Sequence, residues 1–140
     1  MGDGMGLLLD DLADLLSSGG VATTTYRGIM PEIPDDALQL VETGGLAAVH
    51  AMSASAGAAH EERPTVQIMR RSPVYNRARA EMNVIWKLLD GLGDRSINGT
   101  RYLWIAARQS PFGVGRDETN RYLVACNFDV CKALSTTTST

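Results

Sequence analysis

The sequence has few of the residues on which most catalytic and metal sites depend. Only two cysteines and two histidines, His50 and His60, occur among 140 residues. A zinc site needs several Cys, His or carboxylate ligands on rigid elements, and no such cluster accompanies the histidines. No Gly-x-Ser-x-Gly turn and no phosphate-binding glycine loop is present. We therefore expect a protein that is not an enzyme, with no catalytic, metal-binding or cofactor-binding residue.

Clustered positive charge and long apolar runs are also missing. The net charge is −3 at pH 7, whereas sustained binding to nucleic acid needs clustered Lys and Arg. The short run Leu7–Leu9 is broken at once by Asp10 and Asp11, so no signal peptide is expected. No stretch approaches the apolar length that spans a membrane. We therefore expect neither specific nucleic-acid binding nor membrane association.

The two cysteines, Cys126 and Cys131, lie five residues apart in one expected strand. An odd offset in a strand places side chains on opposite faces, so the two thiols cannot pair with each other. We expect small buried or half-buried side chains and a reducing compartment.

The first third of the chain predicts one helix followed by two strands. Leucines recur at helical spacing ahead of a Gly-Gly pair, which predicts a helix over Met5–Ser18. Val21–Arg27 is rich in Val, Thr and Tyr and predicts a strand. Ala37–Thr43 alternates apolar and polar residues and predicts a second strand, closed by Gly44 and Gly45.

Residues 44–62 are dominated by Ala, Gly and Ser. A structureless connection longer than about 12–15 residues is unusual in a compact domain and tends to be functional or disordered. We interpret the stretch as a flexible insertion that orders against a partner. A short Ala-rich helix is the alternative.

The second half predicts a strand, a helix and a hairpin. Thr65–Arg71 is expected to be a strand, and Ser72-Pro73 has the form of a helix start, a cap residue followed by Pro. Apolar residues at helical spacing then continue to Leu89. The expected core face of this helix consists of Tyr75, Ala78, Met82, Ile85, Trp86 and Leu89. Two further strands, joined by a loop, are expected at Tyr102–Gln109, after an Asn98-Gly99 turn, and at Arg121–Cys131, with the loop at Pro111–Glu118.

These elements predict an α+β fold. It consists of a mainly antiparallel sheet of about five strands, with two helices packed on one face and the flexible insertion between the second and third strands. Residues 1–134 form a single domain, and the Ser/Thr-rich residues 135–140 form a disordered tail.

Several arginines lie close to one another in this arrangement. Arg70 and Arg71 end one strand, and Arg108, Arg116 and Arg121 belong to the final hairpin. Arginine is enriched where protein surfaces meet. Interface anchors and ordinary solvated surface are therefore two equally weighted interpretations.

The second half resembles a known family through an ordered set of short segments. The segments are Glu42-Thr43-Gly44-Gly45, Pro64 to Ile68 with Arg70-Arg71, Ala78 through Leu92, Ile97 to Tyr102, Gln109-Ser110-Pro111, Gly115 to Glu118, Arg121-Tyr122 and Cys126-Asn127-Phe128. This order is similar to that of the tail terminator proteins of long-tailed bacteriophages, also called minor capsid or tail completion proteins. The resemblance covers roughly residues 37–134.

The resemblance implies a structural virion protein without cofactors. Such proteins form a ring, usually of six copies, that ends polymerisation of the tail tube and offers a docking surface to the head-side connector or stopper. The partners are then further copies of the chain, the tube protein and the connector, and DNA passes through the lumen without specific binding. The site is the head–tail junction of the virion, after assembly in the host cytoplasm.

Charged residues are the candidates for subunit contacts, since opposite charges across a ring interface fix its register. We assign the interface to Arg70, Arg71, Arg108, Arg116, Asp117, Glu118 and Arg121. Exposed edges of the first or second strand offer a further way to continue into a neighbour.

Other functions remain open at this point. A head-tail connector or stopper protein is the structural alternative. A monomeric α+β module that binds a small molecule or peptide is the alternative of a different class, and it needs a preformed pocket. An enzyme would need His50 or His60 brought to a rigid site.

Overall fold

The computed structural model describes residues 7–49 and 61–133. These residues form two helices and seven strands. In chain order they are α1 (Leu8–Ser18), β1 (Thr25–Arg27), β2 (Ala37–Val49), β3 (Glu61–Ser72), α2 (Tyr75–Leu89), β4 (Arg95–Ile97), β5 (Thr100–Ala107), β6 (Phe112–Arg116) and β7 (Tyr122–Ala133). The predicted α+β class is confirmed.

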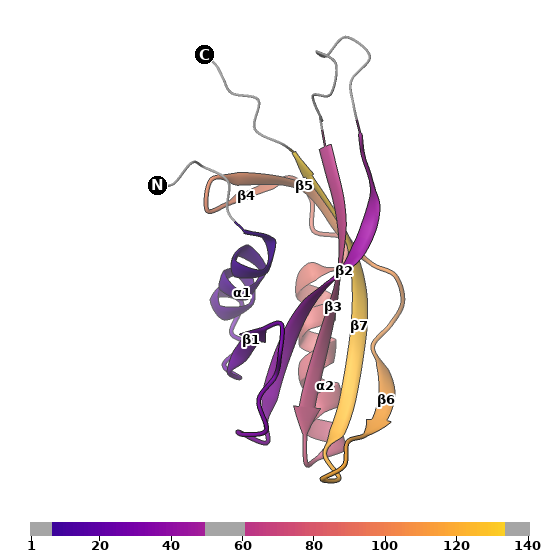
Figure 1. The fold of residues 1–140 in the computed structure, drawn as a ribbon. Coiled ribbons are helices and arrows are strands. Elements are labelled where there is room, and N and C mark those ends of the chain that lie inside the picture. The colour runs from indigo at the N-terminus through magenta and orange to yellow at the C-terminus, as the bar shows by residue number, and fades with distance from the viewer. Residues whose placement is uncertain (1–6, 50–60, 134–140) are drawn as a thin grey trace.

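All seven strands belong to one sheet, larger than the five strands expected (Figure 1). The order is β1-β2-β3-β7-β5-β4, and β6 also pairs with β7. β1 runs parallel to β2, whereas the other pairs are antiparallel. The sheet is therefore mixed, because its short first strand runs in the same direction as its neighbour.

The strands β2 and β3 are longer than the sequence suggested, and the predicted insertion is wrong at both of its ends. Residues 44–49 and 61–62 belong to the two strands. The register shifts between Glu42 and Gly45, where Gly44 and Gly45 have φ values of +105° and +146°. A Cβ atom on Gly45 would lie 2.4 Å from the Arg63 carbonyl oxygen. The Gly-Gly pair therefore forms a bulge within the strand and does not end it. Residues 50–60, with both histidines, lie outside the described residues.

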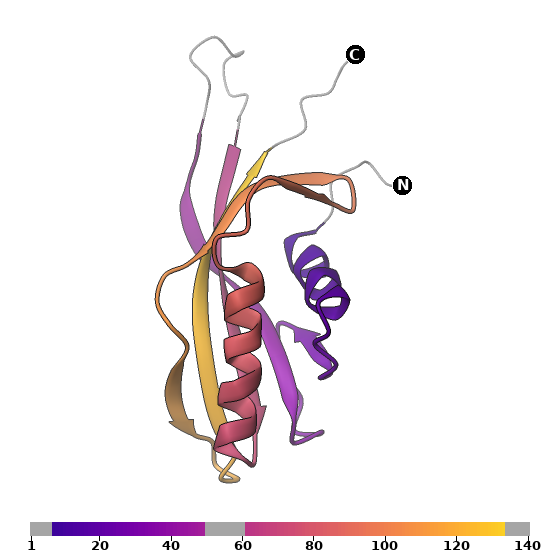
Figure 2. The same ribbon diagram turned by 180° about the vertical axis from the view of Figure 1, so that it is seen from behind.

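Both helices pack on the same face of the sheet, as expected (Figure 2). The predicted α2 face is confirmed for Ala78, Met82, Ile85 and Leu89, which are fully buried, whereas Tyr75 is 40% exposed. The leucines of α1 join the same core. The even-numbered β7 residues Val124, Cys126, Phe128 and Val130 contact them from the sheet. The core therefore lies between the helices and the sheet.

A hairpin formed by β4 and β5 extends over α1 (Figures 1 and 2). Its two-residue turn is Asn98-Gly99, and both residues have positive φ, as in the hairpin turns that Asn-Gly favours. The Asn98 amide donates to the Oδ1 atom of Asp11 at 2.9 Å, and the Tyr102 hydroxyl donates to its Oδ2 atom. Asp11 is fully buried and links α1 to the hairpin. Its position in the first turn of α1 also lets its negative charge interact favourably with the helix dipole.

Other boundaries differ from the predictions in the N-terminal third and after the third strand. The strand expected over Val21–Arg27 is reduced to β1, because the Val21 N–H bonds to the Leu16 carbonyl oxygen and stays with the end of α1. Ser72 belongs to β3, and α2 begins after Val74. The described part of α1 begins at Leu8. Residues 134–140 lie outside the described residues.

Candidate functional site

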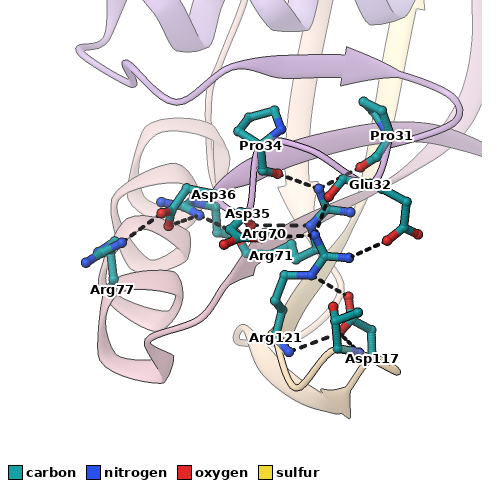
Figure 3. Close-up of polar contacts among 11 residues, drawn as sticks. Pro31, Glu32, Pro34, Asp35, Asp36, Arg70, Arg71, Arg77, Asp117 and Arg121 are labelled. Atoms are coloured by element: carbon teal, nitrogen blue, oxygen red, sulfur yellow. Dashed lines mark hydrogen bonds and ion pairs between the residues drawn. The ribbon is translucent and has the colours of Figure 1, made fainter.

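Three connections meet at the end of the sheet that lies at the bottom of Figure 1. They are the loop of residues 28–36, called the 28–36 loop below, the 72–74 turn before α2, and the turn of residues 117–121 between β6 and β7. Polar contacts among them are drawn in Figure 3. This end contains most of the residues assigned to an interface from the sequence.

Arg71 holds the 28–36 loop by its backbone. Its side chain is 4% exposed and donates to the carbonyl oxygens of Pro31 and Pro34, each at 2.6 Å, and of Asp35 at 3.3 Å (Figure 3). Burial and the like charge of Arg121 lower the pKa of Arg71. A planar guanidinium offers several fixed donors, so one buried side chain fixes a turn of backbone that has no strand partner.

Arg121 holds the same loop from the other side. It is 5% exposed, and it donates to the Glu32 carbonyl oxygen, to the Glu32 carboxylate at 3.1 Å and to the Asp35 carboxylate at 3.3 Å. Its Nε atom donates to Asp117 at 2.8 Å. Backbone hydrogen bonds from Arg121 and bonds from Thr119 lower the pKa of Asp117 to about 2. Asp117 therefore stays ionised and orients Arg121 toward the loop.

Arg70 points to the helix side, because neighbouring strand residues face opposite ways. It is 3% exposed, pairs with Glu81 on α2 and contacts Asp36 at 3.0 Å. Arg77 of α2 reaches the other oxygen of Asp36 at 2.7 Å. Burial alone would raise the pKa of Asp36, but hydrogen bonds from Ser72 and Arg70 and the arginine charges outweigh it, so the pKa lies below its usual range.

The 28–36 loop turns large apolar side chains toward solvent. Ile29 is 90% exposed and Ile33 is 77% exposed, the highest values among the large hydrophobic side chains in the described residues. Single exposed apolar residues are normal on a protein surface. Two aliphatic side chains in a loop held by two buried arginines form a fixed apolar projection.

The β6–β7 turn lies beside this loop and is mixed in charge. Arg116 is exposed, with its guanidinium carbon 5.7 Å from the centre of the Tyr122 ring. A hollow of about 300 Å³ opens here, lined by Glu32, Arg116, Asp117, Glu118, Thr119 and Arg121. All six lining residues are polar or charged, and the hollow is open to solvent. Such a hollow suits a contact surface better than an enclosed small-molecule site.

The structure brings five of the seven predicted interface residues together at this end, namely Arg71, Arg116, Asp117, Glu118 and Arg121. Arg70 lies behind them on the helix side. Arg108 lies apart and pairs with Asp129 at 2.8 Å. Arg70, Arg71 and Arg121 are buried within the chain, so the well-exposed predicted residues at this end are Arg116 and Glu118. Whether they contact a subunit stays a prediction.

Sequence reasoning missed the partners of these arginines. The sequence patterns assigned no role to Asp35 and Asp36, nor to Ile29 and Ile33. One signal was available in the sequence. Residues 28–36 combine apolar, proline and acidic residues between two expected strands, and the arginines had no assigned acidic partners.

Within residues 7–49 and 61–133, no group of three or more His, Cys, Asp or Glu side chains is placed to hold a metal ion. Both cysteines are buried and free, and burial raises the pKa of Cys126 to about 11. No helix in the described part of the chain is long and apolar enough to cross a membrane.

A family model described as "Bacteriophage tail terminator protein" matches residues 11–132. A solved chain from the virion of a native gene transfer agent particle is 10% identical, with 96% of this chain and 100% of that chain covered and a TM-score of 0.64. A second solved chain is 15% identical, with coverage of 86% and 88% and a TM-score of 0.47. No curated protein matches significantly. At 10% identity, the chain from the gene transfer agent virion shows a shared fold alone.

Proposed function

The chain belongs to the bacteriophage tail terminator family, and from that membership we propose that it forms a ring, of six copies, on the end of the phage tail tube. The ring ends polymerisation of the tube and provides the docking surface for the head-side connector. The observation that carries the proposal is the family match, which spans residues 11–132 and so nearly all of the described fold. The subunit acts by assembly, without catalysis.

The geometry of the sheet supports a ring. A closed ring needs two different surfaces on each subunit, because each copy contacts one neighbour on either side. The described sheet has open edges at β1, β4 and β6, and Figures 1 and 2 place β1 and β6 on opposite sides of the molecule. The predicted interface around Arg116 and Glu118 lies at the β6 side.

The burial of the other predicted residues changes how they act in the proposal. Arg71 and Arg121 are almost wholly buried, and their donors are used within the chain. We therefore assign them to holding the 28–36 loop in the shape that a neighbour contacts. Only the exposed residues of the turn make the contact.

The charge of the subunit fits a channel through which DNA moves. The net charge is −3, and a strongly basic lumen would retain phosphates and oppose sliding. The ring therefore lets DNA pass through without specific binding, at the head–tail junction of a virion assembled in the host cytoplasm.

The test is the mass of the chain by light scattering, alone and with cognate tail tubes. We expect a closed ring, or a monomer that becomes a ring only on the tube. Tubes grown with the chain should also stop lengthening, whereas tubes grown with an unrelated protein of similar mass and charge should not. A monomer that ignores the tube would contradict the proposal. Binding to the connector but not to the tube would point to a stopper.

A further inference from the structure

The 28–36 loop has a fixed shape and an apolar exterior. Two buried arginines donate to the carbonyl oxygens of Pro31, Glu32, Pro34 and Asp35, so four peptide groups are fixed without a strand partner. A buried ionic network is costly to desolvate and is weak evidence for stability alone. Here it orders a loop that leaves Ile29 and Ile33 in solvent. An ordered loop costs less entropy when it binds.

The strand β6 is the second unusual surface. All five of its residues, Phe112–Arg116, are exposed, including Phe112 at 37% and Val114 at 49%. Among the described strands it pairs with β7 alone, so its other edge is open. A strand with apolar side chains and an open edge is a template for association.

The described residues leave the apolar parts of both surfaces uncovered. The 28–36 loop joins β1 to β2 and reaches the turn that follows β6, where Glu32 and Arg116 line one hollow, whereas Phe112 and Val114 lie nearer the start of β6 (Figures 1 and 2). The high exposure of Ile29, Ile33 and Val114 shows that, within residues 7–49 and 61–133, no other side chain covers them. A second copy of the chain offers a cover for both surfaces.

The charges of the two surfaces are complementary. The loop presents the side chains of Glu32 and Asp35, which are 86% and 63% exposed although both pair with the buried Arg121 of their own chain. β6 ends at Arg116, which is exposed and forms no ion pair among the described residues. An acidic apolar loop and a basic apolar strand on one chain favour a contact between copies.

We propose that the 28–36 loop of one subunit packs its Ile29 and Ile33 against the exposed β6 strand, at Phe112 and Val114, of the next copy of this chain. The contact joins two different surfaces, so it repeats around a ring. It rests on the proposed function, because it names the surfaces by which the proposed ring closes.

The experiment compares three aspartate variants in assembly on cognate tail tubes. Ile33→Asp disrupts the loop, and Val114→Asp disrupts β6. Val84→Asp is the matched control, because Val84 is 48% exposed on α2, close to the 49% of Val114. We expect the association constant for ring formation to fall at least about 10-fold in the first two variants, which corresponds to a loss of about 1.4 kcal/mol in association free energy. Each should keep a wild-type melting temperature, and the control should assemble like wild type.

A mixture sharpens the test. Ile33→Asp chains keep an intact β6, and Val114→Asp chains keep an intact loop, so an equal mixture retains one good contact per pair. We expect the mixture to form two-chain species at concentrations where neither variant associates alone. Ile33→Cys and Val114→Cys chains, mixed and oxidised on the tube, should form an intermolecular disulfide that a Val84→Cys partner does not.

The outcomes separate the two proposals. Wild-type rings together with normal assembly of Ile33→Asp and Val114→Asp would overturn the loop–strand contact and leave the ring standing. A cross-link no stronger than that of the Val84→Cys control would do the same. A wild-type chain that neither associates nor binds tubes would overturn both.

Discussion

Arg70 and Arg71 are neighbours in β3, yet they serve two different regions of the molecule. Arg70 faces the helices and pairs with Glu81 in a layer that is mostly apolar. Arg71 faces the other side and donates to backbone carbonyls of the 28–36 loop. Both are almost fully buried.

The difference between these regions separates folding from assembly. On the helix side, packing of fully buried side chains supplies the stability, and Arg70 secures the end of that layer. The 28–36 loop has little apolar contact with its own chain, since Ile29 and Ile33 are exposed. Its shape depends on hydrogen bonds to two arginines. Damage on the helix side should lower global stability, whereas damage on the loop side should lower local order and assembly.

The largest effect is expected for Arg70→Met. The change leaves Glu81 and Asp36 without their buried partner, and breaking a buried pair by removing one member costs about 3–5 kcal/mol. Urea unfolding followed by circular dichroism measures the loss. A loss below about 1 kcal/mol would contradict the assignment of Arg70 to the fold.

A smaller effect on stability is expected for Arg71→Met. The loop carbonyls can bind water once the guanidinium is gone, so the loss should be about 1.5–3 kcal/mol, the range for hydrogen bonds to charged groups. The rate of amide hydrogen exchange should rise within residues 28–36 and stay unchanged in α2. Ring assembly should decrease as the loop loses its order. If exchange rose equally in α2, the two regions would not be separable.

Asp117→Asn tests the same region through pH. The pKa of Asp117 lies at about 2 in the folded chain, below its ordinary value of 3.8. The ionised carboxylate therefore contributes stability that is fully present above about pH 4 and is lost as the pH falls toward 2. The difference in unfolding free energy between wild type and variant should shrink over that window. A difference that is constant from pH 5 to 2 would show that the charge of Asp117 does not matter.

The smallest effect is expected for Arg108→Ala. The Arg108–Asp129 pair is exposed, at 49% and 36%, and exposed pairs contribute at most about 1 kcal/mol. Arg108 lies apart from the other predicted interface residues, so assembly should stay close to wild type. Loss of ring formation in this variant would extend the interface to the end of β5.

Periodicity was the part of the sequence that predicted the fold well. The helical spacing of the leucines and of the α2 residues identified both helices and their buried faces, because amphipathic spacing records which side meets a core. The sequence did not reveal β6. Its glycines, Gly113 and Gly115, are typical of a loop. Because β5 pairs only with the second half of β7, the edge of the first half is free, and β6 pairs with it.

The candidate site was predicted less completely. The arginines were identified as important, but which of them are buried depends on where the 28–36 loop folds, and no local pattern records that. Arg71 and Asp35 are 36 positions apart and meet only in the folded chain. The Gly44-Gly45 bulge was missed for a related reason. A Gly-Gly pair can end a strand or form a bulge within it, and the local sequence does not distinguish the two cases.

The loop–strand contact can be seen in a cryo-electron microscopy reconstruction of cognate tail tubes capped with this chain. We expect a ring at the tube end in which residues 28–36 of each copy lie against residues 112–116 of the next. A bare tube end, or a ring in which the 28–36 loop remains in solvent, would contradict it.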